Sequence, residues 1–377
     1  MIKVEGGSFF KSKFGDLNDF FNIANLSDVT FVERAGTDLP IIDIQFLSNE
    51  EGLRRLNENV QLDITIGVDE SPRNNVLESN FILQRPVISY AGENIWSISA
   101  KGIDSNLVNW SKSNVEISKK QSGVERILDV VKSFRVNSNV SKSNDSQNWI
   151  QYGQPNKLHV DDIWMHVDLP NSFLMLAACL DEFRVYDMLT LIKSEPSWYF
   201  VETNARASNH IVIDSDYTIE NQSGFLNAIG ARGQNQPQYD LDNGVSDLLS
   251  NDPESLLAIT DKLNVNENFS KVHNERKVLN RNVHPNYWKS FIHNYTQMIL
   301  YSNVRITLSW SGPYYPVKPL DLVMFKESSM YGNQVQSTEL YSGLYIVSKV
   351  SRRLNKNVFS TTVQLVRENF ARQVNAV

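Results

Sequence analysis

The chain has 377 residues, of which 41% are hydrophobic and 21% charged, as in globular proteins built from about two to four compact domains. Its 43 acidic residues outnumber its 36 Lys and Arg residues, and the formal net charge of −7 argues against stable binding to nucleic-acid phosphates. No apolar run approaches the ~20 residues of a membrane-spanning helix, the N-terminus lacks a secretory-signal pattern, and the single cysteine, Cys179, excludes an intramolecular disulfide and a thiolate zinc site.

The N-terminal part of the chain is predicted to be a β domain. Apolar and polar residues alternate through residues 60–68, which is the period of two expected of a strand with one buried face. Turn-rich stretches separate this strand from its neighbours. Residues 48–51 predict one short helical turn, because they open with a serine in an N-cap-like position. The other predicted strands cover residues 41–47, 76–83 continued by 87–90 beyond Pro86, and 96–101.

The middle of the chain carries helical signals. A helix is predicted to open at Ser122, because apolar residues recur at i, i+3, i+4 and i+7 from Val124. Residues 137–148 are almost all polar and predict an exposed loop. A second helix is expected over residues 170–183. A short pair of strands is then expected at residues 188–192 and 198–202.

The C-terminal part combines a polar insertion with a second β module. Residues 233–274 are rich in Asn, Gln and Asp and too long for an ordinary loop, so they predict an insertion that is mobile or ordered by a partner. Pro285 then marks the first turn of an amphipathic helix. Alternation at residues 303–310, a proline-marked corner and two strands at 341–350 and 358–366 predict an antiparallel barrel or sandwich closed by a hairpin.

The best candidate for chemistry is the stretch from His159 to His166, which also contains Asp161 and Asp162. Two imidazoles and two carboxylates are able to bind a divalent metal or to act as acid and base. Their spacing matches no metal motif of defined geometry, and the turn signals around them disfavour a helix. We therefore interpret the stretch as a polar surface loop.

Three further groups are weighed in the same way. His284 and His293 flank the predicted helix and are interpreted as capping and surface residues. Asp214 and Asp216 follow a strand, and paired carboxylates hydrolyse glycosides only across a cleft of suitable width, so acidic turn residues are the favoured interpretation. Aromatic residues are able to bind sugars, but packing at a domain or subunit interface is favoured. These aromatic residues are Trp310, Tyr314 and Tyr315. No catalytic residue, cofactor or metal ligand is predicted.

The C-terminal module resembles a known family. Residues 344–350, an Asn-rich turn and residues 359–368 are similar to the closing segment of the baseplate central hub proteins of contractile-tailed phages, such as the T-even coliphages, which are related to the hub part of type VI secretion spike proteins. The N-terminal strands follow the order of the first domain of those hubs. Leu320 departs from the family pattern, because it stands where the common Pro-Gly-Asp corner has its glycine.

The resemblance implies an α+β, mainly β fold with two similar antiparallel β-barrel tube domains. The first is expected over residues 1–120 and the second, discontinuous one over 206–234 and 285–371. A mixed middle domain is expected over 121–205 and a polar insertion over 235–284.

The same resemblance implies a structural, non-enzymatic role in the virion tail baseplate, with synthesis in the host cytoplasm. A homotrimer would form a pseudo-sixfold ring that joins a hexameric tail tube, or its initiator protein, to a trimeric central spike. Tape-measure and baseplate wedge proteins are further expected partners, and no segment spans a membrane. DNA would pass only in transit, through a passage that an acidic chain makes repulsive. Because the chain ends at Val377, soon after its last predicted strand, the spike is expected to be a separate polypeptide.

Two other functions stay open on the sequence alone. The first is a carbohydrate-binding or carbohydrate-degrading tail protein that uses the aromatic residues with Asp214 and Asp216. The second is a hexameric distal tail ring protein, which also uses tube-like β domains. Ring symmetry separates these functions, because a hub is threefold, a distal tail ring is sixfold and an enzyme requires neither.

Overall fold

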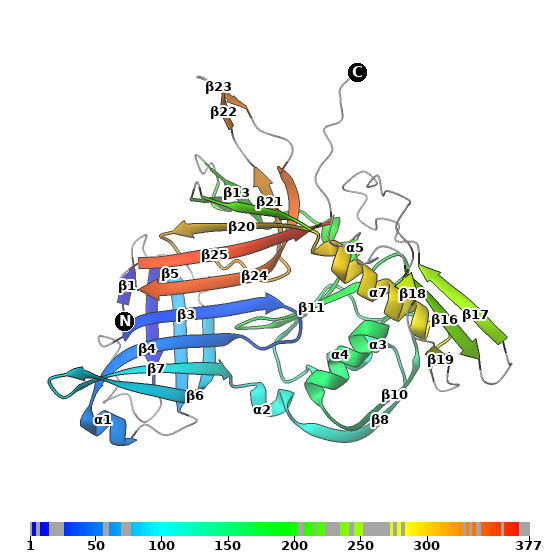
Figure 1. The fold of residues 1–377 in the computed structure, drawn as a ribbon, viewed down its shortest axis with the longest axis horizontal. Coiled ribbons are helices and arrows are strands. Elements are labelled where there is room, and N and C mark those ends of the chain that lie inside the picture. The colour runs from blue at the N-terminus through cyan, green and yellow to red at the C-terminus, as the bar shows by residue number, and fades with distance from the viewer. Residues whose placement is uncertain are drawn as a thin grey trace.

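Alternating apolar side chains assemble most of the described strands into one large sheet. In the computed structural model, 17 strands belong to a single, largely antiparallel sheet (Figure 1). In β20 (Val304–Ser311), for example, every second side chain is buried between less buried neighbours, as the period of two requires. The predicted fold class, α+β and mainly β, is confirmed.

The structure describes most of the chain. None of the helices in the part it describes is long and apolar enough to cross a membrane. The described residues are 2–4, 8–14, 26–55, 60–68, 77–202, 207–214, 216–222, 234–240, 245–251, 272–273, 277–279, 283–326, 329–331, 334–336, 341–355 and 358–368.

Five consecutive strands form what we call the N-terminal unit. In space they lie in the order β3-β4-β7-β6-β5, and every pair is antiparallel. The helical turn predicted after residue 48 is α1 (Glu50–Arg55), which links β4 to β5. Beyond β5 the sheet continues into β2 (Ser8–Lys13) and β1 (Ile2–Val4). The five strands are β3 (Leu26–Ala35), β4 (Ile41–Asn49), β5 (Gln61–Val68), β6 (Leu77–Gly92) and β7 (Ile95–Asp104).

The C-terminal unit repeats this arrangement with the same chain order. Its strands lie in the order β15-β20-β25-β24-β21, and every pair is again antiparallel. Beyond β21 the sheet continues into β13 (Trp198–Val201) and β14 (His210–Val212), both in parallel pairing. With β20, the strands of this unit are β15 (Thr218–Asn221), β21 (Leu322–Lys326), β24 (Gly343–Asn355) and β25 (Val358–Arg367).

Each unit has its own apolar core. The N-terminal core gathers side chains such as Phe31, Ile44 and Phe81, all almost fully buried. The C-terminal core is built in the same way around residues such as Ile306 and Val363. Strand for strand, β3, β4, β5, β6 and β7 therefore match β15, β20, β21, β24 and β25, although the residues show no direct repeat.

A mixed region connects the two units. The hairpin of β11 and β12 joins the large sheet through β3, and β9 pairs in parallel with β12. The strands β8 and β10 form a separate two-stranded ribbon. The elements of this region are α2 (Leu107–Trp110), β8 (Ser113–Gln121), α3 (Gly123–Val130), β9 (Val136–Ser138), β10 (Gln147–Pro155), α4 (Asn156–His166), β11 (Leu174–Ala178), β12 (Phe183–Asp187) and α5 (Met188–Ile192).

The helix predicted at Ser122 is confirmed, but the loop predicted at residues 137–148 is only partly right. Ser122 and Glu125 form a reciprocal capping box at the start of α3. The loop bends back to the same end of the helix, where Ser143 accepts a hydrogen bond from the Val124 amide and Asp145 accepts one from the Gly123 amide. Both side chains are buried, because they satisfy helix amides that have no partner within the helix.

Two predictions of secondary structure in this region are wrong. The helix expected over residues 170–183 is instead the hairpin of β11 and β12, and all five side chains of β11 are buried. A short apolar run without polar alternation fits a buried strand as well as a helix. The strand expected at 188–192 is the helix α5, whose first turn is capped by the Asp187 carboxylate. The strand β13 confirms the other half of that predicted pair.

The insertion contains regular structure that its composition did not predict. The strands β16 and β17 form an antiparallel hairpin, and β18 and β19 pair with β16 to complete a four-stranded sheet. Residues 252–271 lie outside the described part of the chain. The elements of the insertion are β16 (Gln234–Asp240), β17 (Val245–Asn251), β18 (Val272–His273) and β19 (Lys277–Leu279). Outside it lie the predicted helix after Pro285, α7 (Tyr287–Tyr301), and the small hairpin of β22 (Ser329–Tyr331) with β23 (Gln334–Gln336).

Candidate assembly interface

The two units are joined edge to edge by β3 and β24. These strands pair antiparallel from Arg34 opposite Lys349 to Asp28 opposite Asn355. The eight strands β6-β7-β4-β3-β24-β25-β20-β15 therefore form one continuous surface (Figure 1). The joint is reinforced on the surface by an ion pair in which the Arg353 Nε lies 3.0 Å from the Asp28 Oδ2.

Both ends of this eight-stranded surface are open within the described residues. At one end, β6 pairs with β5 only through residues 77–82, so residues 87–92 have β7 on one side and no strand on the other. At the other end, β15 pairs with β20 alone. An open edge presents unpaired N–H and C=O groups and is a ready template for pairing with another chain.

The open edges correspond to the two strands of the joint. When the two units are compared strand by strand, β15 is the equivalent of β3. Residues 87–92 of β6 are the equivalent of the part of β24 that pairs with β3. In the joint, Thr30 lies opposite Arg353. When Thr218 is aligned with Thr30, the strand pairings of the two units place Ser89 at the position of Arg353. The two open edges are thus of the same kinds as the two strands that pair in the joint.

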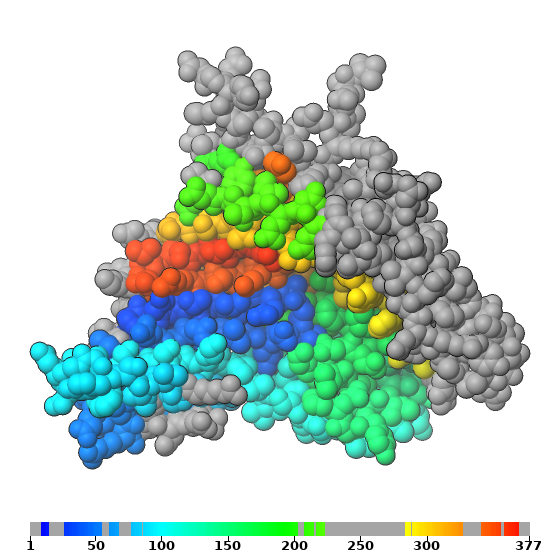
Figure 2. Space-filling model, in the orientation of Figure 1, coloured from blue at the N-terminus to red at the C-terminus, as the bar shows by residue number. Residues whose placement is uncertain are grey.

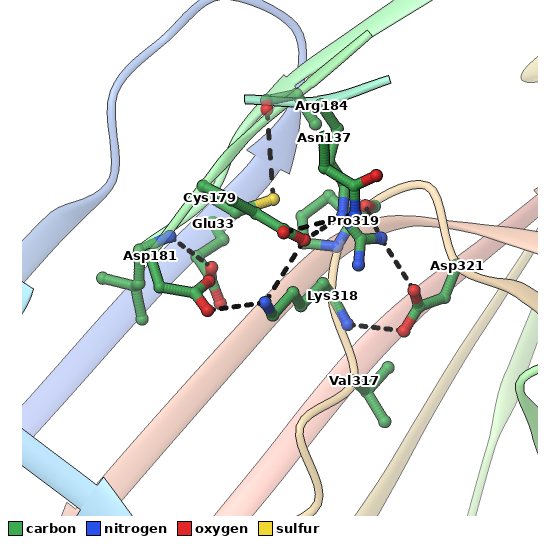
Figure 3. A network of polar contacts seen from close by, with 12 residues as sticks. Glu33, Asn137, Cys179, Asp181, Arg184, Val317, Lys318, Pro319 and Asp321 are labelled. Atoms are coloured by element: carbon green, nitrogen blue, oxygen red, sulfur yellow. Dashed lines mark hydrogen bonds and ion pairs between the residues drawn. The ribbon is translucent and has the colours of Figure 1, made fainter. Parts of the chain in front are cut away.

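A buried charged junction holds the two units and the mixed region together (Figure 3). At its first centre, Arg184 of β12 donates to the Glu182 carboxylate at 2.7 Å and to the Asp321 carboxylate at 2.7 Å. Lys318 lies between the carboxylates of Asp181 and Glu182, at 2.7 and 3.2 Å. The junction thereby ties the turn between β11 and β12 to the corner that precedes β21.

The second centre of the junction lies between the units themselves. Arg352 of β24 forms an ion pair with Glu33 of β3, and both side chains are fully buried. Glu33 also accepts a hydrogen bond of 2.8 Å from the Leu180 amide, and Arg352 donates to the Val317 carbonyl. A buried ion pair of this kind needs such extra hydrogen bonds, because its two charges have lost their hydration.

The electrostatics of the junction keep the Glu182 carboxyl ionised and the Cys179 thiol protonated. Burial alone raises the pKa of the Glu182 carboxyl, but the charges of Arg184 and Lys318 outweigh it and hold that pKa below its usual range. Burial raises the pKa of the Cys179 thiol well above its usual value, so the only cysteine stays protonated. The junction is therefore a structural lock, and it offers no thiolate nucleophile.

The corner beside this junction has a backbone conformation that suits glycine. Leu320 has a φ of +68°, in the left-handed region that residues with a Cβ rarely adopt. Its amide donates to the Val347 carbonyl at 2.8 Å, while Asp321 accepts from Arg184 and from the Lys318 amide. The departure from Pro-Gly-Asp thus keeps the left-handed turn, and the Leu320 side chain is buried in the core behind it.

A polar cleft of about 1000 Å³ lies between the N-terminal unit and this junction. Its walls include the carboxylates of Asp63, Glu78 and Asp104 and the guanidinium of Arg135. Burial raises the pKa of Asp104, and hydrogen bonds from Asn106 counteract part of that effect. No histidine is among the described lining residues, and the neighbouring thiol is protonated, so we identify no activated nucleophile there.

The stretch interpreted as a polar surface loop is the helix α4, so this interpretation is wrong. Its prolines lie outside the helix, and Pro155 directly precedes its first residue. His159 is buried and accepts a hydrogen bond of 3.2 Å from the Arg126 Nε. Burial, with a contribution from the Arg126 charge, lowers the pKa of His159 to about 4. His166 is also buried and stacks on Tyr287 at 3.7 Å.

The carboxylates of this helix do not combine with its histidines into a metal site. Asp161 accepts from Thr37 and pairs with Lys157 at 3.2 Å, which ties the helix to the segment after β3. In the described part of the chain, no three His, Cys, Asp or Glu side chains come together in a way that could hold a metal ion.

His284 is buried, which corrects its interpretation as a surface residue, and His293 is half-buried at the Ser172 carbonyl.

The groups considered for sugar binding are not arranged as a binding platform. Trp310 and Tyr314 are each 2% exposed and belong to the cores of different units. Tyr315 packs against Trp310 at the edge of the C-terminal core. Asp214 and Asp216 are exposed, and Asp214 accepts a hydrogen bond of 3.1 Å from the Ser309 hydroxyl. The aromatic residues therefore pack inside the protein, Trp310 and Tyr315 with the C-terminal core and Tyr314 in the N-terminal core.

Comparisons with solved structures identify the class of protein that has this fold. A tail protein of Neisseria meningitidis is similar over 96% of this chain and 97% of its own, with 8% identity and a TM-score of 0.54. The 43 kDa tail protein of prophage MuSo2 from Shewanella oneidensis is similar over 96% of this chain and 98% of its own, with 8% identity and a TM-score of 0.56. No family model matches the sequence, and no curated protein is significantly similar to it.

A third structure connects this fold to the predicted family. An Escherichia coli component of the type VI secretion system, described as structurally similar to the T4 bacteriophage tail proteins gp27 and gp5, matches 97% of this chain and 79% of its own. Its identity is 8% and its TM-score 0.51. The chain therefore has the fold of phage tail proteins, and the resemblance to baseplate hub proteins is confirmed at the level of fold.

Proposed function

We propose that the protein is a structural component of a phage tail or related injection machine, in which three copies form a closed ring. The observation that supports this proposal is the repeated unit together with its joint. Each chain supplies two matching units joined through β3 and β24, and its open edges correspond to the same two strands. Pairing of β6 with β15 of the next copy gives a contact of one type that closes without leaving an edge.

The ring would act as the hub between parts of different symmetry. Three copies present six matching units, which suits a sixfold tail tube on one side and a threefold central spike on the other. The fold shared with phage tail and type VI secretion proteins supports this assignment. The location in a tail baseplate follows from it, with tube, spike and tape-measure proteins as partners. The proposed role is non-enzymatic.

The face of the eight-stranded surface that turns away from the two cores would line the passage. It carries hydroxyl and amide side chains, for example Ser99 and Thr362. Charges of both signs occur on it, and two ion pairs form there, Asp28 with Arg353 and Lys101 with Asp43. Arg34 and Lys349 lie opposite each other on this face and are both exposed, so phosphates would meet positive charge at the joint. The residues of this face therefore predict a passage of mixed charge in place of the acidic passage inferred from net charge.

The ring is tested by a cross-link whose position the joint defines. Ser89 and Thr218 are both exposed, and their equivalents Arg353 and Thr30 lie opposite each other. In the variant Ser89→Cys/Thr218→Cys we expect oxidation to give covalent dimers and trimers, and no larger species, on a non-reducing gel. The matched control is Ser89→Cys/Thr362→Cys, because Thr362 is exposed on a strand that already has neighbours on both sides.

The same gel decides between the remaining assemblies. A ladder that extends to six copies would favour a hexameric distal tail ring over the hub. Absence of any cross-link at concentrations where the protein is oligomeric would exclude pairing of β6 with β15. Class averages from electron microscopy provide an independent check, since the hub should show six lobes related by threefold symmetry.

A further inference from the structure

The ribbon of β8 and β10 presents an apolar face to solvent. Val115 and Ile117 on β8 lie opposite Tyr152 and Ile150 on β10 in the antiparallel register. Val115, Ile117, Tyr152 and Ile150 are 78, 59, 83 and 49% exposed. On the opposite face, Trp149 is buried in the core formed with α3 and α4. Two facing pairs of large apolar side chains form a patch of the kind that marks an interaction site.

The ribbon has no other strand beside it. Within the described residues, β8 and β10 pair only with each other and stand apart from the large sheet. Its inner face packs against α3 and α4, and the outer face of such a ribbon in water is usually polar. Apolar residues on this outer face are therefore explained if another surface covers it in the assembled protein.

The position of the ribbon indicates which surface that is. The chain leads from β7 through the short helix α2 directly into β8. The ribbon consequently lies along the same margin of the molecule as the β6–β7 hairpin, which carries the open edge (Figures 1 and 2). In the proposed ring, the next copy docks at that margin.

The small size of the contact between β6 and β15 is a second reason to expect that the ribbon contacts the next copy. The strand β15 has only 4 residues, so its pairing with β6 is short. A stable interface buries about 800 Å² on each partner, which is more than a short strand pairing supplies. We infer that the apolar face of the ribbon is a second contact between copies and packs against the next copy of this chain in the ring. This inference rests on the proposed ring.

The contact is tested by removing its apolar side chains without disturbing the fold. In Ile117→Ser/Tyr152→Ser both substituted residues are exposed, so we expect an unchanged circular dichroism spectrum. We expect the dissociation constant of the ring, measured by light scattering over a dilution series, to rise at least tenfold. The matched control is Val358→Ser, which removes an apolar side chain that is 48% exposed on β25, away from the ribbon.

A labelling experiment separates this inference from the ring itself. Ile117→Cys should react with a maleimide at least ten times more slowly in the assembled protein than after dilution to single chains, while the buried Cys179 contributes no background. If the Ser89→Cys/Thr218→Cys ladder forms but the labelling rates are equal, the ribbon contact is refuted and the ring stands. If the ladder is absent, the ring is refuted first.

Discussion

Leu320 shows how one side chain can occupy a conformation that suits glycine better. Its φ of +68° carries a steric penalty of about 1–2 kcal/mol for a residue with a Cβ, but its buried side chain fills part of a core. Loss of a buried leucine side chain costs about 2–5 kcal/mol. Packing therefore outweighs backbone strain at this position.

This balance predicts an unusual order of stabilities at position 320. Leu320→Gly loses the packing but relieves the backbone, so we expect a net destabilisation of roughly 0–4 kcal/mol. Leu320→Ala loses the packing and keeps the Cβ in the left-handed region, so it should be less stable than the glycine variant by about 1 kcal/mol. Denaturant midpoints measure the order. An alanine variant as stable as the glycine variant would contradict the left-handed conformation.

His159 makes the stability depend on pH in a defined direction. Burial lowers its pKa to about 4 in the folded protein, whereas an unfolded chain binds the proton near 6.5. Between these values the unfolded state holds more protons, so the contribution of His159 is fully present above about pH 6.5 and is lost as the pH falls towards 4. We expect His159→Gln, whose amide oxygen can still accept from Arg126, to have a weaker pH dependence of its melting temperature in that window. Parallel curves for the two proteins would show that His159 does not titrate there.

At the scale of elements, the joint between β3 and β24 depends on the buried pair of Glu33 and Arg352. Removal of one partner leaves an uncompensated charge, so we expect Arg352→Leu to destabilise the protein by about 3–5 kcal/mol. The double variant Glu33→Gln/Arg352→Leu removes both charges and leaves an oxygen to accept from the Leu180 amide. Its free energy of unfolding should lie between those of the single Arg352 variant and the unmodified protein. A double variant less stable than Arg352→Leu would contradict this account.

Elements with a strict period of two were predictable from the sequence, as β5 and β20 show. This alternation is absent from a strand that is buried on both faces, so the five consecutive buried residues of β11 were predicted to be a helix. The prediction also failed at α4, where buried histidines interrupt the apolar stripe. The candidate interface was harder to predict from the sequence, because it depends on contacts between residues far apart in the chain. Glu33 and Arg352 are 319 positions apart, and no local pattern connects them. Only the equivalence of the two end modules pointed in that direction.

At the scale of the whole molecule, the joint within a chain and the proposed contact between copies are equivalent in geometry but different in strength. Within the chain, the joint has the buried pair of Glu33 with Arg352 and the surface pair of Asp28 with Arg353. At the β6 edge the matching residues are Ile88 and Ser89, which carry no charge. The contact between copies lacks both ion pairs, so dilution should open the ring and leave each chain folded.

Amide hydrogen exchange over a dilution series tests this hierarchy. As the ring dissociates, the amides of residues 87–92 and of β15 should lose protection, because their pairing partners lie on another copy. The amides that pair β3 with β24 should keep their protection at every concentration, since that ladder lies within the chain. Protection of β6 and β15 that is independent of concentration would mean that their edges are not used between copies. If the amides of the β3–β24 joint lost protection at the same dilution, the two units of a chain would separate as easily as two copies do. The single chain would then not be a rigid pair of units. A ring of three chains with pseudo-sixfold symmetry requires such a pair.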